Sequence, residues 1–593
     1  MKIKVSDYII KLLEQKGVDT AFCITGGAAA HLIESLRISD MQVFHNYNEQ
    51  ACAMSADGYA RIAKKPALVM VTNGPGSSNA ITGVLGAWQD SVPMIVLSGQ
   101  VPRHQTLAAE VRSLRQLGLQ EADIISMVKH CTNHAVQITQ TSNIKQEIDK
   151  AWHLATSGRM GPVWLDIPID IQAEIIETDD QLEYVIEAVD TRVHSIEGIV
   201  TAIKNSKKPL IVAGNGIHLG NAENEFLQLV NQLQIPVVAT WNAKDLFNSD
   251  DDLYVGNFGL LGERAANFAI QQADLLIVLG SRLSIPVTGY NTKDFSPNSK
   301  KIMVDLDENE ILKHTLTIDY PYVGHVKDFI NDIKDIIEPS KRQLWNNTVK
   351  GWKERFPVFS ENHVRADGFV NSFDFMQHLS NAMRPDDVVV TDMGTSFTCT
   401  MQSLQHTGKD RLFTSSALCS MGFGLPGAIG AYTANANNRV ICIAGDGGFQ
   451  MNIQELQTVA QYNLPIKIII LNNDGYLAIS LMQDNLFNGN HFGATSASGV
   501  GSPKFVELSK AYGIPAYKLK TITDVKNNLA FLLSESGPCL IEINMVRNQL
   551  LIPRVQSKRD ASGKIVSGSI DAMFPFLTDK EIDQVLTESR SCE

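Results

Sequence analysis

Short apolar runs rich in β-branched residues recur along the whole chain and alternate with helical stretches of mixed polarity. Runs such as VICIAG and IKIIIL are too short for a typical helix, and they lack the alternation of a half-exposed strand. Each is therefore typical of a strand that is buried on both faces. Such strands alternate with helices in parallel sheets. The sequence predicts an α/β protein made of doubly wound parallel sheets.

The chain has 593 residues, which is more than a single hydrophobic core normally serves, so several domains are expected. The strand-like runs fall into three blocks that are separated by polar segments without strand rhythm. We predict domains at 1–170, 190–340 and 365–550. A basic, glycine-containing tail follows at 551–593, and we expect it to act as an active-site lid, with disorder as the alternative.

The overall charge and the cysteine pattern exclude some classes of protein. A net charge of −13 argues against a nucleic acid or an anionic membrane surface as the partner. No apolar run is long enough to span a bilayer, and the stretch MKIKVSDYIIKLLEQKGVD continues as an amphipathic helix without a signal-peptide cleavage site. The eight cysteines form no CxxC pair. A reduced, cytoplasmic protein is the simplest interpretation.

One strand–helix–strand unit predicts a binding site. Asp446 follows the run VICIAG in the turn GDGG, and Asn473 follows the run IKIIIL, with an amphipathic helix over 452–463 between them. Ligands of open α/β sheets bind at the carboxyl ends of strands, and two oxygen donors without a nearby His or Cys favour Mg²⁺ or Ca²⁺ over zinc. Gly447 and Gly448 allow close backbone approach at a helix N-terminus, which suits a phosphate. Taken alone, the turn could be only a capped helix start.

The GDG…NN pattern resembles the diphosphate signature of the thiamine diphosphate (ThDP) enzymes. The stretch HNYNEQACAMSADGYAR is similar to the one that holds the family's activating glutamate, here Glu49. The stretches TNGPGSSNAITGVLGAWQDSVPMIVLSGQVPR, ATSGRMGPVWLDIP and SMGFGLPGAIGA resemble the large catalytic subunit of acetolactate synthases in particular. The likeness covers the whole chain. It implies that the three blocks are pyrimidine-binding, central and diphosphate-binding domains.

The resemblance implies a role for each matching residue. Asp446, Asn473 and the Gly475 carbonyl are expected to hold Mg²⁺ against the diphosphate. Glu49 is expected to exchange a proton with the aminopyrimidine ring, which requires partial burial, and Gln120 joins it as a catalytic residue. Without the resemblance, Glu49 could instead be a carboxylate at the start of a helix, where the helix dipole stabilises a negative charge. The other implied cofactor contacts are Gly26, Gly27, Asn79, Gly394, Thr395, the Cys419 carbonyl, Met421 as an apolar wedge, Gly445, Gly447, Gly448, Tyr476 and Leu477.

Two further expectations come from the same resemblance. In the family the glutamate reaches a cofactor that is held by the partner chain, which implies a homodimer or homotetramer. The central block is similar to flavin-binding stretches, so FAD is expected, although a GNG turn alone is often only a strand end. FAD would be structural, because decarboxylation and ligation transfer no net electrons. The residues implied for FAD are Gly214, Gly216, Arg282 and Asp305.

The chain departs from acetolactate synthases at positions near the acceptor substrate. In RLSIPVTG, Pro286 stands in place of an arginine that grips the acceptor carboxylate, and proline cannot bind a carboxylate. Four further positions differ from the branch pattern in charge or bulk: Leu119, Ile169, Ala478 and Met482. The donor side is intact. We therefore expect the acceptor to be a carbonyl compound other than a second 2-oxo acid.

The expected reaction is decarboxylation of pyruvate, or a similar 2-oxo acid, and transfer of the resulting acyl carbanion to that acceptor. The chain also resembles the acetyl-transferring ThDP flavoenzymes of branched-chain deoxysugar pathways, whose acceptor is a nucleotide-linked keto-sugar. Two alternatives remain. One is acetolactate synthase proper, which joins two pyruvates and releases CO₂. The other is a catalytically idle regulatory or binding subunit.

Overall fold

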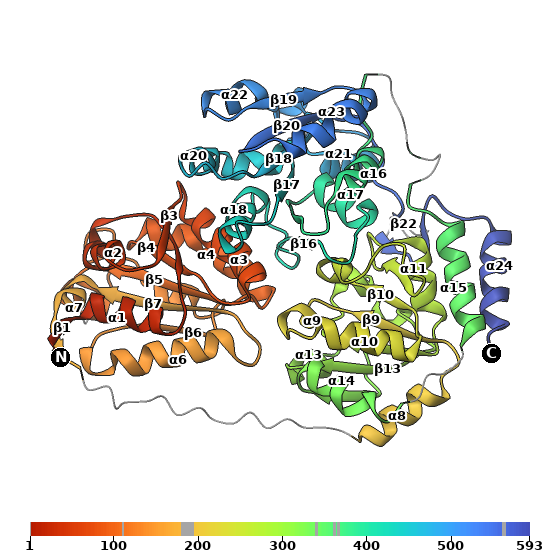
Figure 1. Ribbon diagram of the computed structural model, residues 1–593, viewed down its shortest axis with the longest axis horizontal. Coiled ribbons are helices and arrows are strands. Elements are labelled where there is room, and N and C mark those ends of the chain that lie inside the picture. Colours follow the sequence, from red (N-terminus) through yellow and green to blue (C-terminus); the bar gives the residue numbers. More distant parts are fainter. Residues whose placement is uncertain are drawn as a thin grey trace.

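The computed structural model describes residues 2–109, 112–178, 195–337, 342–359, 363, 368–559 and 565–593. Three six-stranded sheets, each entirely parallel, form three α/β domains that Figure 1 shows as separate layered bodies. The predicted fold class is confirmed. Within the described part of the chain, no helix combines the length and the apolarity needed to cross a bilayer.

The first domain has the strand order β3-β2-β4-β5-β7-β6. Its strands are β2 (Thr20–Cys23), β3 (Gln42–His45), β4 (Leu68–Val71), β5 (Met94–Gln100), β6 (His134–Gln137) and β7 (Pro162–Pro168). Its helices are α1 (Val5–Gln15), α2 (Ala30–Arg37), α3 (Glu49–Ala63), α4 (Pro75–Gln89), α5 (Ile124–Val128), α6 (Ile144–Thr156) and α7 (Ile169–Ala173). A small antiparallel ladder joins β1 (Lys2–Lys4) to β8 (Ile175–Glu177).

The central domain has the order β11-β10-β9-β12-β13-β14, which is 3-2-1-4-5-6 counted along the chain, the order of dinucleotide-binding sheets. Its strands are β9 (Pro209–Ala213), β10 (Val237–Ala239), β11 (Tyr254–Asn257), β12 (Leu275–Leu279), β13 (Lys300–Asp305) and β14 (Tyr320–Val323). Its helices are α8 (Ile196–Asn205), α9 (Gly216–Leu219), α10 (Glu223–Leu233), α11 (Arg264–Gln272), α12 (Ile285–Thr288), α13 (Glu308–Leu312), α14 (Val326–Lys334) and α15 (Gln343–Arg355).

The third domain has the order β16-β15-β17-β18-β20-β19. Counted along the chain this is 2-1-3-4-6-5, the same order as in the first domain. Its strands are β15 (Val388–Thr391), β16 (Arg411–Phe413), β17 (Val440–Gly445), β18 (Lys467–Asn472), β19 (Ala516–Leu519) and β20 (Cys539–Asn544). Its helices are α16 (Ser372–Ala382), α17 (Thr395–Ser403), α18 (Gly424–Ala434), α19 (Asp446–Phe449), α20 (Leu456–Gln461), α21 (Leu477–Phe487), α22 (Phe505–Ala511) and α23 (Ile522–Ser534).

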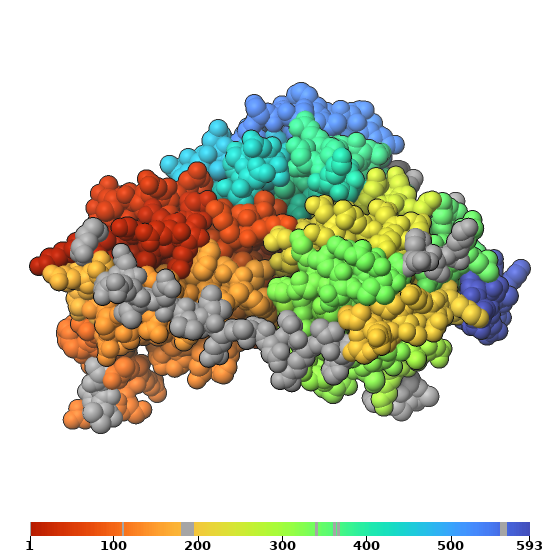
Figure 2. All heavy atoms as spheres, turned by 60° about the horizontal axis from the view of Figure 1, so that its bottom comes forward, coloured from red at the N-terminus to blue at the C-terminus, as the bar shows by residue number. Residues whose placement is uncertain are grey.

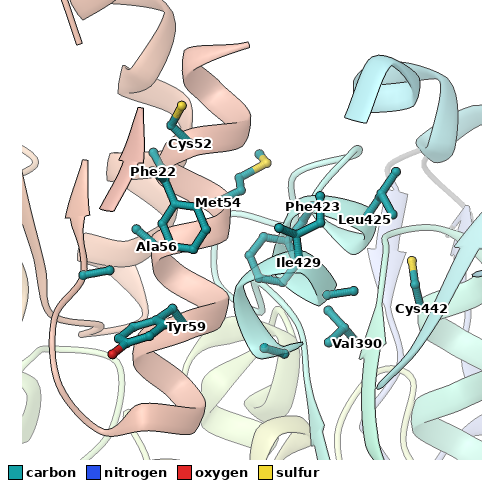
Figure 3. Packing of buried hydrophobic residues seen from close by; sticks show 14 of the residues in the cluster. Phe22, Cys52, Met54, Ala56, Tyr59, Val390, Phe423, Leu425, Ile429 and Cys442 are labelled. Carbon is teal, nitrogen blue, oxygen red and sulfur yellow. The ribbon is translucent and has the colours of Figure 1, made fainter. Parts of the chain in front are cut away.

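Each sheet is apolar on both faces because each face packs into its own core. In β18, Ile468 and Ile470 belong to one buried cluster, whereas Ile469 and Leu471 belong to another. The first of these clusters is shared between the first and third domains. Figure 3 shows its two sides, with Phe22 and Met54 across from Phe423 and Ile429. Burial on both faces explains why the strands read as continuous apolar runs.

Helices α3 and α18 cross at glycines where the two outer domains meet. A Cβ atom on Gly58 would lie 2.1 Å from the Gly427 carbonyl oxygen, and one on Gly430 would lie 1.8 Å from the Ser55 carbonyl oxygen. Each distance is far shorter than a real Cβ contact. The backbones can therefore approach this closely only because both positions lack a side chain.

The helix predicted over 452–463 is wrong in its first half. After α19, a 3₁₀ segment runs over Gln450–Glu455 and is kinked at Asn452, where φ is −137° and ψ is 35°. Only α20 continues as an α-helix. The reason is tertiary: the Asn452 amide donates to the Gly422 carbonyl at 2.9 Å and to Gln50 Oε1 at 3.1 Å. These bonds outweigh the helical pattern.

The tail lies mainly on the central domain. It forms β21 (Arg554–Val555), β22 (Ser557–Arg559), β23 (Ile565–Ser567), β24 (Met573–Phe574) and α24 (Asp579–Arg590). Helix α24 runs beside α15, where Trp352 Nε1 donates to Glu588 at 2.8 Å (Figure 1). Part of the tail also reaches the third domain: Gln402 Nε2 of α17 donates to the Pro553 carbonyl at 2.7 Å, and Gln556 Nε2 donates to Asn485 of α21 at 3.0 Å. The lid role of the tail stays a prediction.

Candidate active site

The turn after β17 and the loop after β18 meet at the carboxyl edge of the third sheet. The Gly475 N–H donates to the Asp446 carboxylate at 2.8 Å, and Asn473 Nδ2 donates to the Gly475 carbonyl at 3.0 Å. Turning the Asn473 amide over would put its oxygen in the place of its nitrogen. The three groups expected to hold Mg²⁺ are therefore brought together in one hydrogen-bonded cluster.

Asp446 is a buried carboxylate that would gain from a nearby cation. Burial raises its pKa, although hydrogen bonds from Ser502 Oγ at 2.5 Å and from the Gly475 N–H oppose the rise. A divalent ion favours the charged form. Among the described residues, no three His, Cys, Asp or Glu side chains form a metal cluster. One carboxylate with neutral oxygens fits Mg²⁺ that keeps phosphate oxygens and water as its other ligands.

The glycines of the turn leave room for close packing and for a ligand. A Cβ on Gly447 would lie 2.1 Å from the Tyr476 ring, and one on Gly448 would lie 2.6 Å from Asp392 Oδ1. By contrast, a Cβ on Gly445 would meet only one carbonyl, 4.0 Å away, and Gly394 faces open space. Tyr476 caps α21, and the buried Leu477 is its first residue.

Gly394 stands at the edge where the chain order of the third sheet reverses. It has φ of +85° and is the N-cap of α17, whose first residue is the buried Thr395. It follows β15, and Gly445 is the last residue of β17, the next strand in the sheet. Ligands of such sheets bind in the crevice between these two strands, and a helix N-terminus there favours a phosphate.

The segment between β16 and α18, residues 414–423, is named here the wedge loop because it includes Met421. Met421 is half-buried, and Cys419 has a left-handed φ of +59°. That conformation costs a non-glycine residue about 1–2 kcal/mol. Strain of this kind clusters at functional sites.

In the first domain, Glu49 is the first residue of α3 and is half-buried. Asn79 of α4 donates to Glu49 Oε2 at 3.1 Å. A Cβ on Gly76 would lie 3.6 Å from Glu49 Oε1, whereas one on Gly26 would lie 2.4 Å from the Thr72 side chain. Gly27 faces open space. The glycines follow β2 and β4, which flank the reversal point of the first sheet, and Glu49 comes to them from the end of β3.

Gln120 lies on an exposed loop beside this cluster and has a left-handed φ of +56°. The loop is held in place next to Gln120, because Asn73 Nδ2 donates to the Leu119 carbonyl at 3.0 Å. The buried Glu121 accepts the backbone N–H groups of Leu117 at 2.9 Å and Gly118 at 3.2 Å. Gln120 itself is left facing outward.

One side chain links the two half-sites within a single chain. Asn452 bonds both to Gln50, the neighbour of Glu49, and to Gly422, the neighbour of Met421. The Glu49 cluster and the wedge loop are therefore adjacent. Sequence reasoning missed Asn452, because its pattern fitted a helix surface. The expectation that Glu49 serves a partner's cofactor stays a prediction.

A second site is a cavity of about 1010 Å³ walled by all three domains, and Figure 2 shows the first and central domains side by side. It lies after β9 and β12, where the order of the central sheet reverses. Gly216, Arg282 and Asp305 line it. Gly214 does not: a Cβ there would lie 2.2 Å from the Gly280 carbonyl oxygen, so it serves packing.

The cavity wall includes polar atoms that lack partners. Asn215 Oδ1, Trp241 Nε1 and Arg61 Nη1 are buried on cavity-lining residues and have no hydrogen-bond partner in the described structure. Burial also raises the pKa of Asp305, at the tip of β13. Unpaired buried polar atoms are costly, so a polar ligand fits here.

The five departures from the acetolactate synthase pattern lie on several elements. Pro286, in α12, lines the cavity, and its carbonyl accepts the Leu260 N–H at 2.9 Å. Leu119 is 82% exposed beside Gln120, and Met482 is 41% exposed on α21. Ala478 is also exposed on α21, and Ile169 begins α7. Their convergence on one acceptor pocket stays a prediction.

Family models of thiamine pyrophosphate (ThDP) enzymes match along the chain. The N-terminal TPP-binding domain matches residues 3–127, the central domain 196–333 and the C-terminal TPP-binding domain 392–543. The chain belongs to the thiamine pyrophosphate enzyme family. It is an acetolactate synthase-like, ThDP-dependent carboligase.

Its relatives in this family match over nearly their full length. A probable acetolactate synthase large subunit of Methanocaldococcus jannaschii is 33% identical, over 91% of this chain and 92% of the relative. The large subunit of acetolactate synthase isozyme 1 of Escherichia coli is 30% identical, over 93% of this chain and 95% of the relative. The acetolactate synthase large subunit of Lactococcus lactis is 31% identical, over 93% of this chain and 94% of the relative.

Proposed function

We propose that this thiamine pyrophosphate enzyme decarboxylates pyruvate, or a similar 2-oxo acid, and transfers the acyl unit to a carbonyl acceptor. The observation that supports this most is the Asn452 link between the Glu49 half-site and the wedge loop. It ties the residue after Glu49 to the residue after Met421, and Asn452 itself lies six positions after Asp446, so the residues proposed for proton exchange, for the apolar wedge and for the metal come from connected segments.

When bound, ThDP would supply an electron sink for the bond-breaking step. Asp446, Asn473 and the Gly475 carbonyl would hold Mg²⁺ on its diphosphate, with backbone N–H groups of residues 394–395 and 445–448 as further donors. The Cys419 carbonyl would accept a hydrogen bond from the amino group of the aminopyrimidine, and Met421 would pack against the cofactor as an apolar wedge.

Glu49 would hold a proton at the pyrimidine ring nitrogen. The Asn79 amide donates to its Oε2 and so fixes the carboxylate. A proton positioned in this way accelerates a reaction by roughly 10²- to 10⁴-fold. Cys52 and Ala53, on the same helix as Glu49, belong to the apolar cluster shared by the outer domains, so the helix is anchored in apolar packing directly after Glu49.

For the acceptor, we propose a carbonyl compound without a carboxylate, such as a nucleotide-linked keto-sugar. The support is Pro286, because losing a charge-assisted contact to a carboxylate costs on the order of 2–5 kcal/mol. The relatives' names favour a second candidate, acetolactate synthase proper.

The test is pyruvate consumption with and without ThDP and Mg²⁺, followed by identification of the product with and without added aldehydes, ketones and keto-sugar nucleotides. Cofactor-dependent consumption that rises with one of these acceptors supports the proposal. Strong acetolactate formation from pyruvate alone would replace it with the second candidate. No consumption under any condition would favour an idle subunit.

We also propose that the cavity binds FAD. Its volume is at the upper end of the roughly 300–1,000 Å³ typical of ligand pockets, and its unpaired polar atoms suit a dinucleotide. Flavin released on denaturing the purified protein would support this. The variant Asn215→Leu should release less flavin than wild type. Flavin-free protein that also fails to bind added FAD would refute it.

Finally, we propose a homodimer or homotetramer, which sedimentation would measure. Mixing the variants Glu49→Gln and Asp446→Ala under subunit exchange decides how the site is built. If Glu49 acts on the partner's cofactor, each mixed dimer regains one intact site and activity returns. If Glu49 acts within its own chain, as the contact between α3 and α18 allows, the mixture stays inactive.

A further inference from the structure

The wedge loop separates the two proposed sites. Ser416 and Ala417 at its start line the large cavity, whereas Cys419 and Met421 follow on the side of the thiamine site. The loop has no regular structure of its own. The Thr414 N–H bonds to Asn242 of the central domain and the Cys419 N–H bonds within the loop, whereas the N–H groups of Ser416, Ala417 and Gly422 bond to two buried aspartates, one from each outer domain.

Asp90 of the first domain holds the start of the loop. It is the C-cap of α4 and is 8% exposed. It accepts the Ser416 N–H at 2.8 Å, the Ser416 hydroxyl at 3.0 Å and the Ala417 N–H at 3.1 Å. Arg61 Nη2 also donates to it at 2.8 Å. Arg61 has Asp57 as a second ion partner, so neutralising Asp90 would leave no unpaired buried cation.

Asp392 of the third domain holds the end of the loop. It is 1% exposed and follows β15. Its carboxylate accepts the Gly422 N–H at 3.1 Å and the Gly424 N–H at 3.0 Å, together with the N–H of its neighbour Met393 at 2.7 Å. The two aspartates therefore fix both ends of the wedge loop.

Cys419 lies between these two fixed ends in its left-handed conformation. Residues other than glycine rarely adopt it, so a free loop would relax at this position. The anchors at 416–417 and 422–424 prevent that relaxation. The direction of the Cys419 carbonyl and the position of Met421 both depend on this backbone conformation.

We propose that Asp90 and Asp392 are positioning residues that hold the wedge loop in the strained shape required to receive ThDP. The inference rests on the proposed function, because it assigns the loop to the cofactor. It also gives the first domain a part in shaping the thiamine site through Asp90, whose own side chain lines the large cavity. Asp90 therefore couples the packing of the two outer domains to cofactor affinity.

Asp90→Asn and Asp392→Asn test the proposal by two measurements. Hydrogen exchange of the cofactor-free protein should speed up about tenfold or more in the peptide 415–424, since charge-assisted bonds to its N–H groups are weakened. Calorimetric titration with ThDP and Mg²⁺ should show a dissociation constant raised at least about tenfold. Ser416→Ala removes one bond only and should give a smaller change in the same direction.

A rescue experiment separates positioning from general stability. Cys419→Gly removes the strain and should restore much of the ThDP affinity of Asp90→Asn. Gln234→Gly is the matched control, because Gln234 also has a left-handed φ, +51°, but lies at the end of α10. It should not restore affinity.

Unchanged exchange and unchanged ThDP affinity in both aspartate variants would overturn the inference, as would equal rescue by Gln234→Gly. Wild-type protein that fails to bind ThDP would instead refute the proposed function. The hydrogen-exchange measurement still tests the anchoring of the loop in that case, because it needs no cofactor.

Discussion

Gly430→Ala perturbs the crossing of α3 and α18 and connects packing to activity. The new Cβ would lie 1.8 Å from the Ser55 carbonyl oxygen, whereas ordinary contact begins near 3.4 Å. The two helices must separate by the difference, about 1.6 Å. Overpacking of this kind costs about 1–3 kcal/mol of stability.

The effect on turnover should be larger than the effect on stability. Glu49 begins α3, and Met421 lies three residues before α18, so separating the helices shifts one against the other. A misplacement of about 1 Å can reduce turnover roughly 100-fold. We expect kcat for pyruvate consumption at saturating ThDP to fall by about that factor. Denaturant unfolding should give the stability loss.

Gly351→Ala is the control, because Gly351 lies within α15 and no atom would approach its Cβ within 4 Å. It should stabilise the protein by about 0.5–1 kcal/mol and leave kcat unchanged. If Gly430→Ala keeps both wild-type stability and wild-type turnover, the close crossing does not position Glu49, and the reasoning fails.

Three other predictions follow from single side chains. Glu49→Gln should lower kcat by roughly 10²- to 10⁴-fold with little loss of ThDP binding, and full activity would remove Glu49 from the mechanism. Asp446→Asn should weaken Mg²⁺-dependent ThDP binding in calorimetry; identical titrations would show that the metal sits elsewhere. Burial raises the pKa of Asp166 to about 6, so the native protein holds this proton more tightly than the unfolded chain. The unfolding free energy of wild type, minus that of Asp166→Asn, should therefore rise by on the order of 1 kcal/mol from pH 7 to pH 5. A flat difference would contradict the raised pKa.

The sequence showed the inner strands of all three sheets and missed the edge strands. Inner strands such as β18 are covered on both faces and read as continuous apolar runs. Edge strands such as β11 (YVGN), β16 (RLF) and β19 (AYKL) are short or mixed in polarity. Such segments pair because the neighbouring strand is already in place, and no local pattern reveals that.

The same distinction applies to the site. Asp446 and Asn473 could be found because they follow buried strands, and the turn chemistry indicates their use. Asp90, Asp392 and Asn452 could not, because each acts by bonding backbone groups that are distant in sequence. A polar residue with such a role looks like an ordinary surface or capping residue until the fold places its partners.

The shared strand order of the outer domains gives their contact a near-twofold symmetry. Helices α3 and α18 each follow the second strand of their own sheet, and each presents a glycine to a backbone carbonyl of the other. A single ancestral domain could have paired with its own copy through this face, forming two equal crevices. Fusion and divergence would then let one crevice specialise for the ring end of a cofactor and the other for its charged end.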